Sequence, residues 1–340
     1  MSGATTEEDF RRLVEPYRAE LHAHCYRMLG SVHDAEDALQ DAMLRAWRAL
    51  PRFEGRSSVR SWLYRIATNT SLDLIGRRPK RVLPVDYVAG SDPHDEESSA
   101  GEPLVESAWV EPYPDDRLGV EDGLASPAAR YEQRESVELA FTAALQHLPA
   151  TQRAVLILRD VLGFSARESA EMLETTVQSV NSALRRARGS VRGRLPDASQ
   201  QATLRALGDE AVRDVVERYM AALDRGDVDA LVGMLAEDAT WSMPPHHEWF
   251  RGHEAITGFL VEGPLRERWR HLPAHANGQP AVGCYRWDAE RGSYVAAVLD
   301  VLTLDGAGIA EVTAFVTPEI FPRFGLPEEL APSSGPPAGL

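Results

Sequence analysis

Apolar residues recur at helical spacing through the first eighty residues of the chain. Leu21, Cys25, Met28 and Leu29 keep one apolar stripe, and a second stripe from Ala38 to Trp47 follows an acidic first turn at 34–37. Such spacing is typical of amphipathic helices that share a core. The pattern predicts an all-α helical bundle over residues 1–80.

The next fifty residues lose this periodicity. Residues 81–131 are rich in Pro, Gly, Ser, Asp and Glu, with SDPHDEESSAGEP at their centre, and this composition predicts an acidic flexible linker. The run WVEPYP at 109–114 is unusually aromatic for such a linker. We therefore expect a docking segment formed by Trp109, Pro112 and Tyr113, and a stray hydrophobic patch is the alternative.

Helical periodicity returns over residues 132–196. Ser165 precedes Glu168 by three residues, which is the spacing of a capping box at a helix start. A tight turn then leads to a helix over 177–191, with Val177, Val180, Leu184 and Ala187 expected to face the core. A support helix followed by such a helix predicts a helix-turn-helix domain.

A third pattern begins near residue 206. Helices expected at 209–225 and 228–236 precede strand-like runs at 281–287, 293–304 and 308–317. Helices followed by consecutive strands predict an α+β domain over 206–330, and residues 331–340 are expected to be a disordered tail. The fold class is therefore multidomain, with two all-α domains and one α+β domain.

Composition narrows the function classes. The 340 residues contain no apolar run of membrane-spanning length, and the amino-terminal residues are acidic and polar rather than basic and apolar. Cys25 and Cys284 are far apart and have no companion at metal-ligand spacing. We therefore expect a cytoplasmic protein with no membrane partner, no metal and no cofactor.

The net charge of -16 is distributed unevenly along the chain. Residues 1–80 carry 13 basic and 11 acidic side chains, and residues 132–196 carry 9 and 7, so each region is +2. Residues 81–131 carry 3 basic and 12 acidic side chains, net -9, and residues 197–340 carry 11 and 22, net -11. The negative net charge of the whole chain therefore does not exclude nucleic-acid binding by the two helical domains.

Two helices have the composition of nucleic-acid readers. Residues 53–78 combine tryptophan, tyrosine and arginine, which suits stacking on unpaired bases and contact with phosphates. Residues 176–195 carry five arginines and no acid, which suits binding of duplex DNA, although a solvated basic face is the plainer interpretation. One segment suited to separated DNA strands and another suited to duplex DNA together predict a protein that opens promoters.

These segments resemble the bacterial extracytoplasmic-function sigma factors. The resemblance is carried by DAEDALQDAMLRAWRAL at 34–50, by the stretch from Phe53 onward and by TVQSVNSALRRAR at 176–188. It implies core RNA polymerase as a partner, through its largest and second-largest subunits. The implied polymerase contacts are Asp37, Leu39, Gln40, Asp41, Arg45 and Trp47.

The same resemblance implies promoter DNA as a second partner. Residues implied to capture and melt the minus-10 element are Phe53, Gly55, Ser57, Ser58, Arg60, Trp62, Arg65, Asn69, Asp73 and Arg77. The helix-turn-helix residues implied at the minus-35 element are Thr176, Gln178, Ser179, Ser182, Arg185, Arg186 and Arg188. Gln178 and Asn181 stand where many members of the family carry basic residues, so the resemblance does not give the preferred minus-35 sequence.

The C-terminal region resembles the SnoaL-like cone fold, through residues 226–245 and 312–330. That fold wraps a sheet around an apolar pocket and occurs in isomerases and cyclases as well as in noncatalytic sensors. For the polar and aromatic residues of this region, ordinary structural roles in the core or at the pocket rim are favoured over catalysis, so we expect no catalytic residue. We expect a regulatory domain, and a small-molecule ligand is its candidate partner. Candidate pocket residues are Trp241, Met243, His246, His247, Trp249, Tyr285, Trp287 and Asp300.

The leading hypothesis is thus a sigma factor that is regulated by its own SnoaL-like domain and is not an enzyme. The segment WVEPYP at 109–114 resembles the linker of sigma factors that carry this extension, and it is the candidate for the segment that the SnoaL-like domain holds. A one-component helix-turn-helix transcription factor with a ligand-sensing cone domain is the first alternative, but it leaves residues 34–78 without a role. A DNA-binding isomerase or cyclase is the second. A separate anti-sigma factor is neither implied nor excluded by the sequence.

Overall fold

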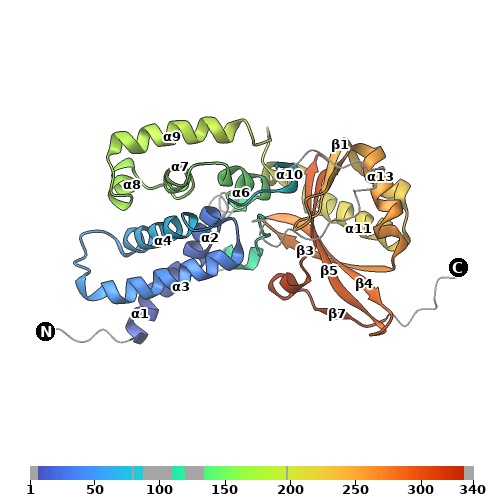
Figure 1. The fold of residues 1–340 in the computed structure, drawn as a ribbon, viewed down its shortest axis with the longest axis horizontal. Helices are drawn as coiled ribbons and strands as arrows, with labels where there is room; N and C mark the ends of the chain where they lie inside the picture. Colours follow the sequence, from blue (N-terminus) through green and yellow to red (C-terminus); the bar gives the residue numbers. More distant parts are fainter. Residues whose placement is uncertain (1–6, 79, 87–108, 119–133, 197, 333–340) are drawn as a thin grey trace. The chain divides into compact units, whose positions relative to one another are not determined.

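The computed structural model describes residues 7–78, 80–86, 109–118, 134–196 and 198–332. The chain divides into two compact units, one made of residues 1–82 and 107–199 and the other of residues 83–106 and 200–340 (Figure 1). Most of the linker expected at 81–131 and most of the tail expected at 331–340 lie outside the described residues. Flexibility of those segments therefore stays a prediction.

The first unit begins with helices that have recognisable sequence signals at their ends. Ser31 accepts a hydrogen bond from the backbone N–H of Asp34, and Ser58 accepts one from that of Ser61, so each side chain satisfies a free donor at a helix start. Gly30 adopts φ of 72°, a left-handed conformation that ends the preceding helix. These helices are α1 (Glu7–Val14), α2 (Arg18–Leu29), α3 (Val32–Ala49) and α4 (Val59–Ile75).

The same unit contains a second set of helices from residue 139 onward. The capping box at Ser165 and Glu168 is present with both of its hydrogen bonds, as the sequence predicts. Thr176 caps the next helix through the backbone N–H of Ser179. This set consists of α6 (Leu139–Gln146), α7 (Ala150–Leu156) with a π-helical turn at Ile157–Val161, α8 (Ala166–Met172) and α9 (Val177–Arg192).

The two helical regions share one hydrophobic core. Figure 1 shows α4 lying between α3 and the α7–α8 layer, and α4 contacts all three of these helices. Arg27 of α2 donates hydrogen bonds to the Ser136 carbonyl oxygen at 3.1 Å and to Ser136 Oγ at 2.6 Å. Gln146 Nε2 of α6 donates in turn to the Arg27 carbonyl oxygen at 3.2 Å. Buried hydrogen bonds thus join the two regions, which the sequence suggested would be separate domains.

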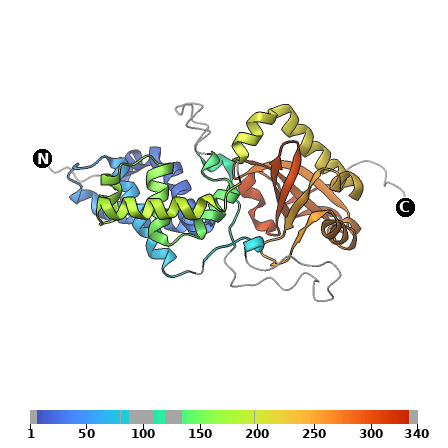
Figure 2. The ribbon, with the colours of Figure 1, turned by 90° about the horizontal axis from the view of Figure 1, so that it is seen from above.

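The second unit is an α+β domain, which confirms the expected fold class. Figure 2 shows α11 lying along one side of the orange and red sheet. The helices are α10 (Gln200–Leu207), α11 (Asp209–Arg225), α12 (Val228–Val232) and α13 (Gly252–Glu262). The strands are β1 (Leu235–Ser242), β2 (Trp249–Arg251), β3 (Trp269–Ala276), β4 (Gln279–Asp288), β5 (Ser293–Asp305), β6 (Gly308–Phe315) and β7 (Glu329–Leu330).

The sheet is mixed and its strand order is β2-β1-β6-β5-β4-β3, with β7 paired to β5. β1 and β6 run parallel, and the other neighbours are antiparallel. Register shifts occur between β4 and β5, between β5 and β6, and between β1 and β6. Such irregularities increase local bending and twist, which curves the sheet around the space that α11 and α13 cover.

Several sequence predictions for this domain need correction. The helix expected at 228–236 ends at Val232, and Leu235 already begins a strand. The sequence interpretation also missed α13 and the β3 strand. The strands expected at 281–287, 293–304 and 308–317 are observed as β4, β5 and β6, with ends that differ by a few residues.

Within the described ranges, none of the helices combines the length and the apolarity that a bilayer crossing requires. The same ranges contain no cluster of three or more His, Cys, Asp or Glu residues arranged to hold a metal ion.

Candidate functional site

One face of α3 is exposed and carries most of the residues expected to contact a protein partner. Asp37, Gln40 and Arg45 are exposed, Asp41 is half-buried, and Arg45 forms ion pairs with Asp41 at 2.8 Å and with Asp73 of α4 at 2.9 Å. Trp47 is half-buried and packs edge-on against Phe10 at a centroid distance of 5.2 Å.

Leu39 does not belong to this exposed face. It is 6% exposed and packs in the hydrophobic core, so its side chain is not accessible on this face, and its role as a polymerase contact stays a prediction. Leu44, which the sequence interpretation omitted, is 46% exposed and follows Gln40 and Asp41 along the same face at helical spacing.

The loop before α4 and the start of that helix form an aromatic surface. The rings of Phe53 and Trp62 lie 4.8 Å apart with an interplanar angle of 34°, and both residues are half-buried. The other expected minus-10 residues differ in exposure. Gly55, Ser57, Ser58, Arg65, Asp73 and Arg77 are exposed, whereas Arg60 and Asn69 are half-buried.

The cationic side chains of α4 already have partners inside the unit. Arg60 forms an ion pair with Glu20 at 3.3 Å, and its guanidinium lies 4.8 Å from the ring centroids of Tyr64 and Phe164. Arg65 lies 3.5 Å from Glu174 in the turn before α9. Because Phe164 and Glu174 belong to the helix-turn-helix region, that region covers part of the expected minus-10 face.

Among the residues that the structure describes, few act as ion-pair partners for the outward face of α9. Gln178, Ser179, Arg185 and Arg186 are exposed, and Ser182 is half-buried. Arg188 is engaged, because its guanidinium donates two hydrogen bonds to Asp160 at 2.8 and 2.7 Å. Thr176 is also exposed, but its hydroxyl caps the helix.

One core assignment on α9 is wrong. Val177 was expected to face the core, but it is 43% exposed at the first position of the helix. Val180, Leu184 and Ala187 are buried as predicted.

The aromatic segment at 109–118 packs against the first helical region. Tyr113 is fully buried, its hydroxyl lies 2.8 Å from His22 Nδ1, and its ring centroid lies 4.4 Å from that of Tyr26. The Tyr26 hydroxyl donates to the Glu111 carbonyl oxygen at 2.8 Å. Trp109 and Pro112 are also buried. The segment thus has defined contacts with α2 of the first unit, and docking of the segment on the C-terminal domain stays a prediction.

Glu111 anchors this segment to the start of α3. Its carboxylate accepts hydrogen bonds from the backbone N–H of Val32 at 3.0 Å and from His33 Nδ1 at 2.9 Å, and Arg81 lies 3.2 Å from it. Burial by itself would raise the pKa of Glu111, but the His33 hydrogen bond and the Arg81 charge lower it overall. A carboxylate at a helix start is also favoured by the helix dipole.

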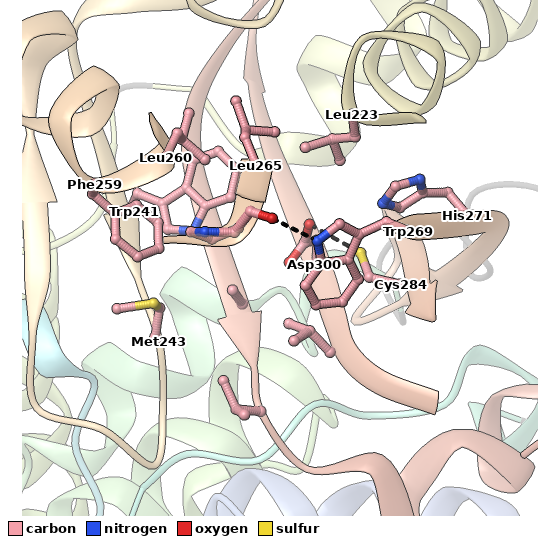
Figure 3. Close-up of a pocket in the computed structure, with 14 residues that line it drawn as sticks. Leu223, Trp241, Met243, Phe259, Leu260, Leu265, Trp269, His271, Cys284 and Asp300 are labelled. Carbon is pink, nitrogen blue, oxygen red and sulfur yellow. Dashed lines mark hydrogen bonds between the residues drawn. The ribbon is translucent and has the colours of Figure 1, made fainter. Parts of the chain in front are cut away.

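The cone domain contains an apolar pocket of about 70 Å³ (Figure 3). Of the eight candidate lining residues, Trp241, Met243 and Asp300 border it, whereas His246, His247, Trp249, Tyr285 and Trp287 do not. Tyr285 instead packs edge-on against Phe321 at 5.2 Å. The remaining lining residues come from α11, α13, β3, β4, β5, β6 and nearby turns: Leu223, Phe259, Leu260, Pro264, Leu265, Trp269, His271, Cys284, Val298, Ala314 and Val316.

Family models match all three regions of the chain. The model described as Sigma-70 region 2 matches residues 13–81, and the model described as Sigma-70, region 4 matches residues 138–191. The model of the SnoaL-like domain matches residues 216–312.

Known proteins share this organisation in whole or in part. The ECF RNA polymerase sigma factor SigG of Mycobacterium tuberculosis is 41% identical over 333 residues, which cover 95% of this chain and 85% of SigG. The ECF RNA polymerase sigma factor SigW of Bacillus subtilis is 31% identical over 193 residues, which cover 56% of this chain and 91% of SigW. The crystal structure of the M. tuberculosis extracytoplasmic function sigma factor SigJ has a TM-score of 0.55 at 23% identity, covering 92% of this chain and 98% of SigJ, and shows a shared fold.

The chain therefore combines sigma-70 regions 2 and 4 with a SnoaL-like domain. It belongs to the extracytoplasmic-function RNA polymerase sigma factors.

Proposed function

We propose that this chain binds core RNA polymerase in the cytoplasm, directs it to promoters and is regulated by its own SnoaL-like domain. In this proposal α3 contacts the polymerase, the α4 region holds the separated strand at the minus-10 element, and α9 reads the minus-35 element. Nucleotide addition is left to the polymerase, so the chain itself needs no catalytic residue.

The observation that carries the polymerase contact is the exposed face of α3. Leu44 is 46% exposed among polar neighbours, whereas the opposite face of the helix packs in the core. Protein interfaces obtain most of their binding energy from a few apolar or arginine side chains that become buried on binding. Leu44, with Asp37, Gln40, Asp41 and Arg45 around it, has that composition.

Replacing Leu44 with arginine tests this contact. Leu44→Arg should weaken binding to core polymerase by roughly tenfold or more, because burial of the leucine is lost and a charge must be desolvated. Val261→Arg is the matched control, since Val261 is 45% exposed on α13 of the cone domain. Affinity is measured by titration of labelled chain with purified core polymerase.

Equal affinities of the two variants would refute the α3 contact. Failure of the unmodified chain to bind polymerase at all would instead favour the one-component transcription factor.

The proposed role in DNA binding follows from the aromatic and basic surfaces. The Phe53–Trp62 pair offers ring faces for unpaired bases, and such stacking contributes about 1–3 kcal/mol per base. The exposed Arg185 and Arg186 on α9 suit contact with phosphates, which positions a helix in the major groove.

Regulation by the SnoaL-like domain is supported by charge and by comparison with SigW. Residues 197–340 carry 11 basic and 22 acidic side chains, which repel DNA phosphates. The SigW match spans 91% of that protein in 193 residues, so SigW is too short to contain a further domain of this size. SigW is thus a sigma factor of this family without such an extension. The extension is therefore not required for the function of a sigma factor, which supports a regulatory role for it in this chain.

Comparison of the full chain with a version that ends at Pro196 tests this regulation. The shorter chain should bind promoter duplex several-fold more tightly at low salt, and the difference should shrink as salt screens the acidic domain over the Debye length of about 8 Å at 0.15 M. Binding is measured by fluorescence anisotropy, and initiation with core polymerase is measured in parallel. Identical DNA binding by both chains at every salt concentration would eliminate the electrostatic mechanism.

A further inference from the structure

The first turns of α9 differ in chemistry from the rest of the helix. Figure 1 shows α9 along the outside of the first unit. Residues 176–195 contain five arginines and no acid, but the charged residues begin only at Arg185, so the segment 177–182 is uncharged. When a helix enters the major groove, residues near its start meet base edges, whereas arginines farther along suit phosphates. The uncharged turns are therefore the place where base identity would be read.

The hydroxyl groups at the start of α9 serve the helix cap. The Thr176 hydroxyl accepts a hydrogen bond from the backbone N–H of Ser179 at 3.1 Å, and it donates to Ser179 Oγ at 2.9 Å. Ser182 is half-buried. Serine hydroxyls can also contact several base edges, because they both donate and accept. The hydroxyl groups of α9 therefore do not determine which base is chosen.

Two amide side chains on the uncharged segment are available to bases. Gln178 and Asn181 are exposed and lie three residues apart, so they share one face of the helix. Among the described residues, neither side-chain amide has a hydrogen-bond partner. An amide can bind adenine through two hydrogen bonds, because its N–H₂ group donates to N7 and its oxygen accepts from N6. A lysine or an arginine at these positions would instead suit O6 and N7 of guanine.

Val177 is an exposed apolar side chain beside these amides. It is 43% exposed at the first position of α9 and precedes Asn181 by four residues, so the two side chains are neighbours on the helix surface. The major groove offers one apolar group to such a side chain, the C5-methyl group of thymine. Since thymine pairs with adenine, the valine and the amides favour the same kind of base pair.

We propose that Gln178 and Asn181 each read an adenine and that Val177 contacts a thymine methyl group, so that the minus-35 element contains neighbouring A·T pairs. Side chains three residues apart on a helix in the major groove are spaced to meet successive bases. The exposed Arg185 and Arg186 contribute affinity through phosphates, without sequence preference. This inference rests on the proposed binding of α9 to the minus-35 element and adds the identity of the bases.

Selection from duplexes with a randomised central segment identifies the preferred sequence. The full chain is incubated with the pool at low salt, and the bound duplexes are sequenced. In the preferred duplex, 7-deazaadenine then replaces each adenine in turn, which removes N7, and uracil replaces each thymine, which removes the methyl group. Neither replacement alters base pairing, so affinities measured by fluorescence anisotropy report single contacts in the groove.

The preferred duplex should contain two neighbouring A·T pairs with separable contacts. A G·C pair at either position should weaken binding roughly 5- to 150-fold, which is the range for a bidentate contact. Loss of the thymine methyl group should weaken binding about fourfold, the factor for one buried methyl-sized group. Gln178→Ala should make one adenine position insensitive to 7-deazaadenine, and Asn181→Ala should do the same at the neighbouring position.

The apolar contact has its own variant and a matched control. Val177→Ser should remove the sensitivity to uracil and keep the sensitivity to 7-deazaadenine, because only the contact with the methyl group is lost. Val261→Ser should leave both sensitivities unchanged, since Val261 is 45% exposed on α13 of the other unit.

Asn181→Arg separates base reading from a structural role in α9. Arginine suits O6 and N7 of guanine, so the selected base should change from adenine to guanine at the position that Asn181→Ala relaxes. The position that Gln178→Ala relaxes should remain adenine. A side chain that only stabilised the helix would not exchange one base for another.

Selection of G·C pairs at the positions that the alanine variants relax would overturn the proposal. Equal weakening of all duplexes by Gln178→Ala and Asn181→Ala would overturn it as well. Binding of duplexes without any base preference would overturn this inference and leave the proposed binding of DNA by α9 in place. Failure to bind any duplex, with or without core polymerase, would overturn both.

Discussion

The two helices expected to bind DNA differ in how much of their binding face is available. On α4, Arg60 is paired with Glu20 and lies over Phe164, and Arg65 lies beside Glu174. On α9, Arg185 and Arg186 are exposed, and Arg188 is paired with Asp160. The surface of α9 proposed to read the minus-35 element is therefore exposed, whereas the α4 surface proposed to hold the minus-10 element is partly covered by the helix-turn-helix region.

This difference suggests that the two readers act in order. The exposed face of α9 can meet duplex DNA without rearrangement of the unit. Phe164 of the helix-turn-helix region lies against the Arg60 guanidinium, so unpaired bases would reach that guanidinium only after the two helical regions part. The buried contacts between Arg27, Ser136 and Gln146 would then set how much free energy this opening costs.

Loosening those contacts should produce the largest effect. Arg27→Met keeps much of the side-chain length but removes both hydrogen bonds to Ser136, and hydrogen bonds to charged groups contribute about 1.5–3 kcal/mol each. Binding of a short single-stranded oligonucleotide should therefore strengthen at least tenfold, because the loss of even one such bond corresponds to roughly a factor of ten, whereas duplex binding through α9 should change little. Both are measured by anisotropy with the full chain.

Two further variants show whether the gain arises from the α4 surface. Arg18→Met is the matched control, because Arg18 is exposed on the same helix, and it should leave both affinities unchanged. Adding Trp62→Ala to Arg27→Met should abolish the gain, since the stacking surface is then lost. A gain that persists without Trp62 would show that single strands bind elsewhere.

The comparison also shows which features of the helical unit are predictable. The capping box at Ser165 and the Thr176 cap follow from local hydrogen-bonding chemistry, and both are observed. Leu39 and Leu44 were harder to distinguish, because both belong to an apolar-rich helix and only the packing of α3 against α2 and α4 decides which leucine is buried. The prediction that Val177 faces the core is wrong, because Val177 is the first residue of α9 and is 43% exposed there.

Residue types alone were not enough to predict which side chains line the pocket of the SnoaL-like domain. Trp241, Met243 and Asp300 were identified, but adjacent strand residues point to opposite faces, so Cys284 borders the pocket while Tyr285 packs on Phe321. A register shift between Cys284 and Tyr285 further alters the pairing of β4 with β5. Periodicity alone cannot locate such a shift, and so the full set of lining residues could not be predicted.

A smaller effect should separate two arginines on α9 itself. Arg185→Ala should weaken binding to all duplex sequences and lower the slope of log affinity against log salt by about one unit, if its guanidinium contacts a phosphate. Arg188→Ala should change the slope less, because Arg188 is already neutralised by two hydrogen bonds from its guanidinium to Asp160. Anisotropy titrations over a series of salt concentrations measure both slopes.

Equal decreases of the salt slope in Arg185→Ala and Arg188→Ala would show that Arg188 exchanges Asp160 for a DNA phosphate. Asp160→Asn should then strengthen duplex binding, because it removes both the competing partner of Arg188 and a negative charge near the DNA backbone.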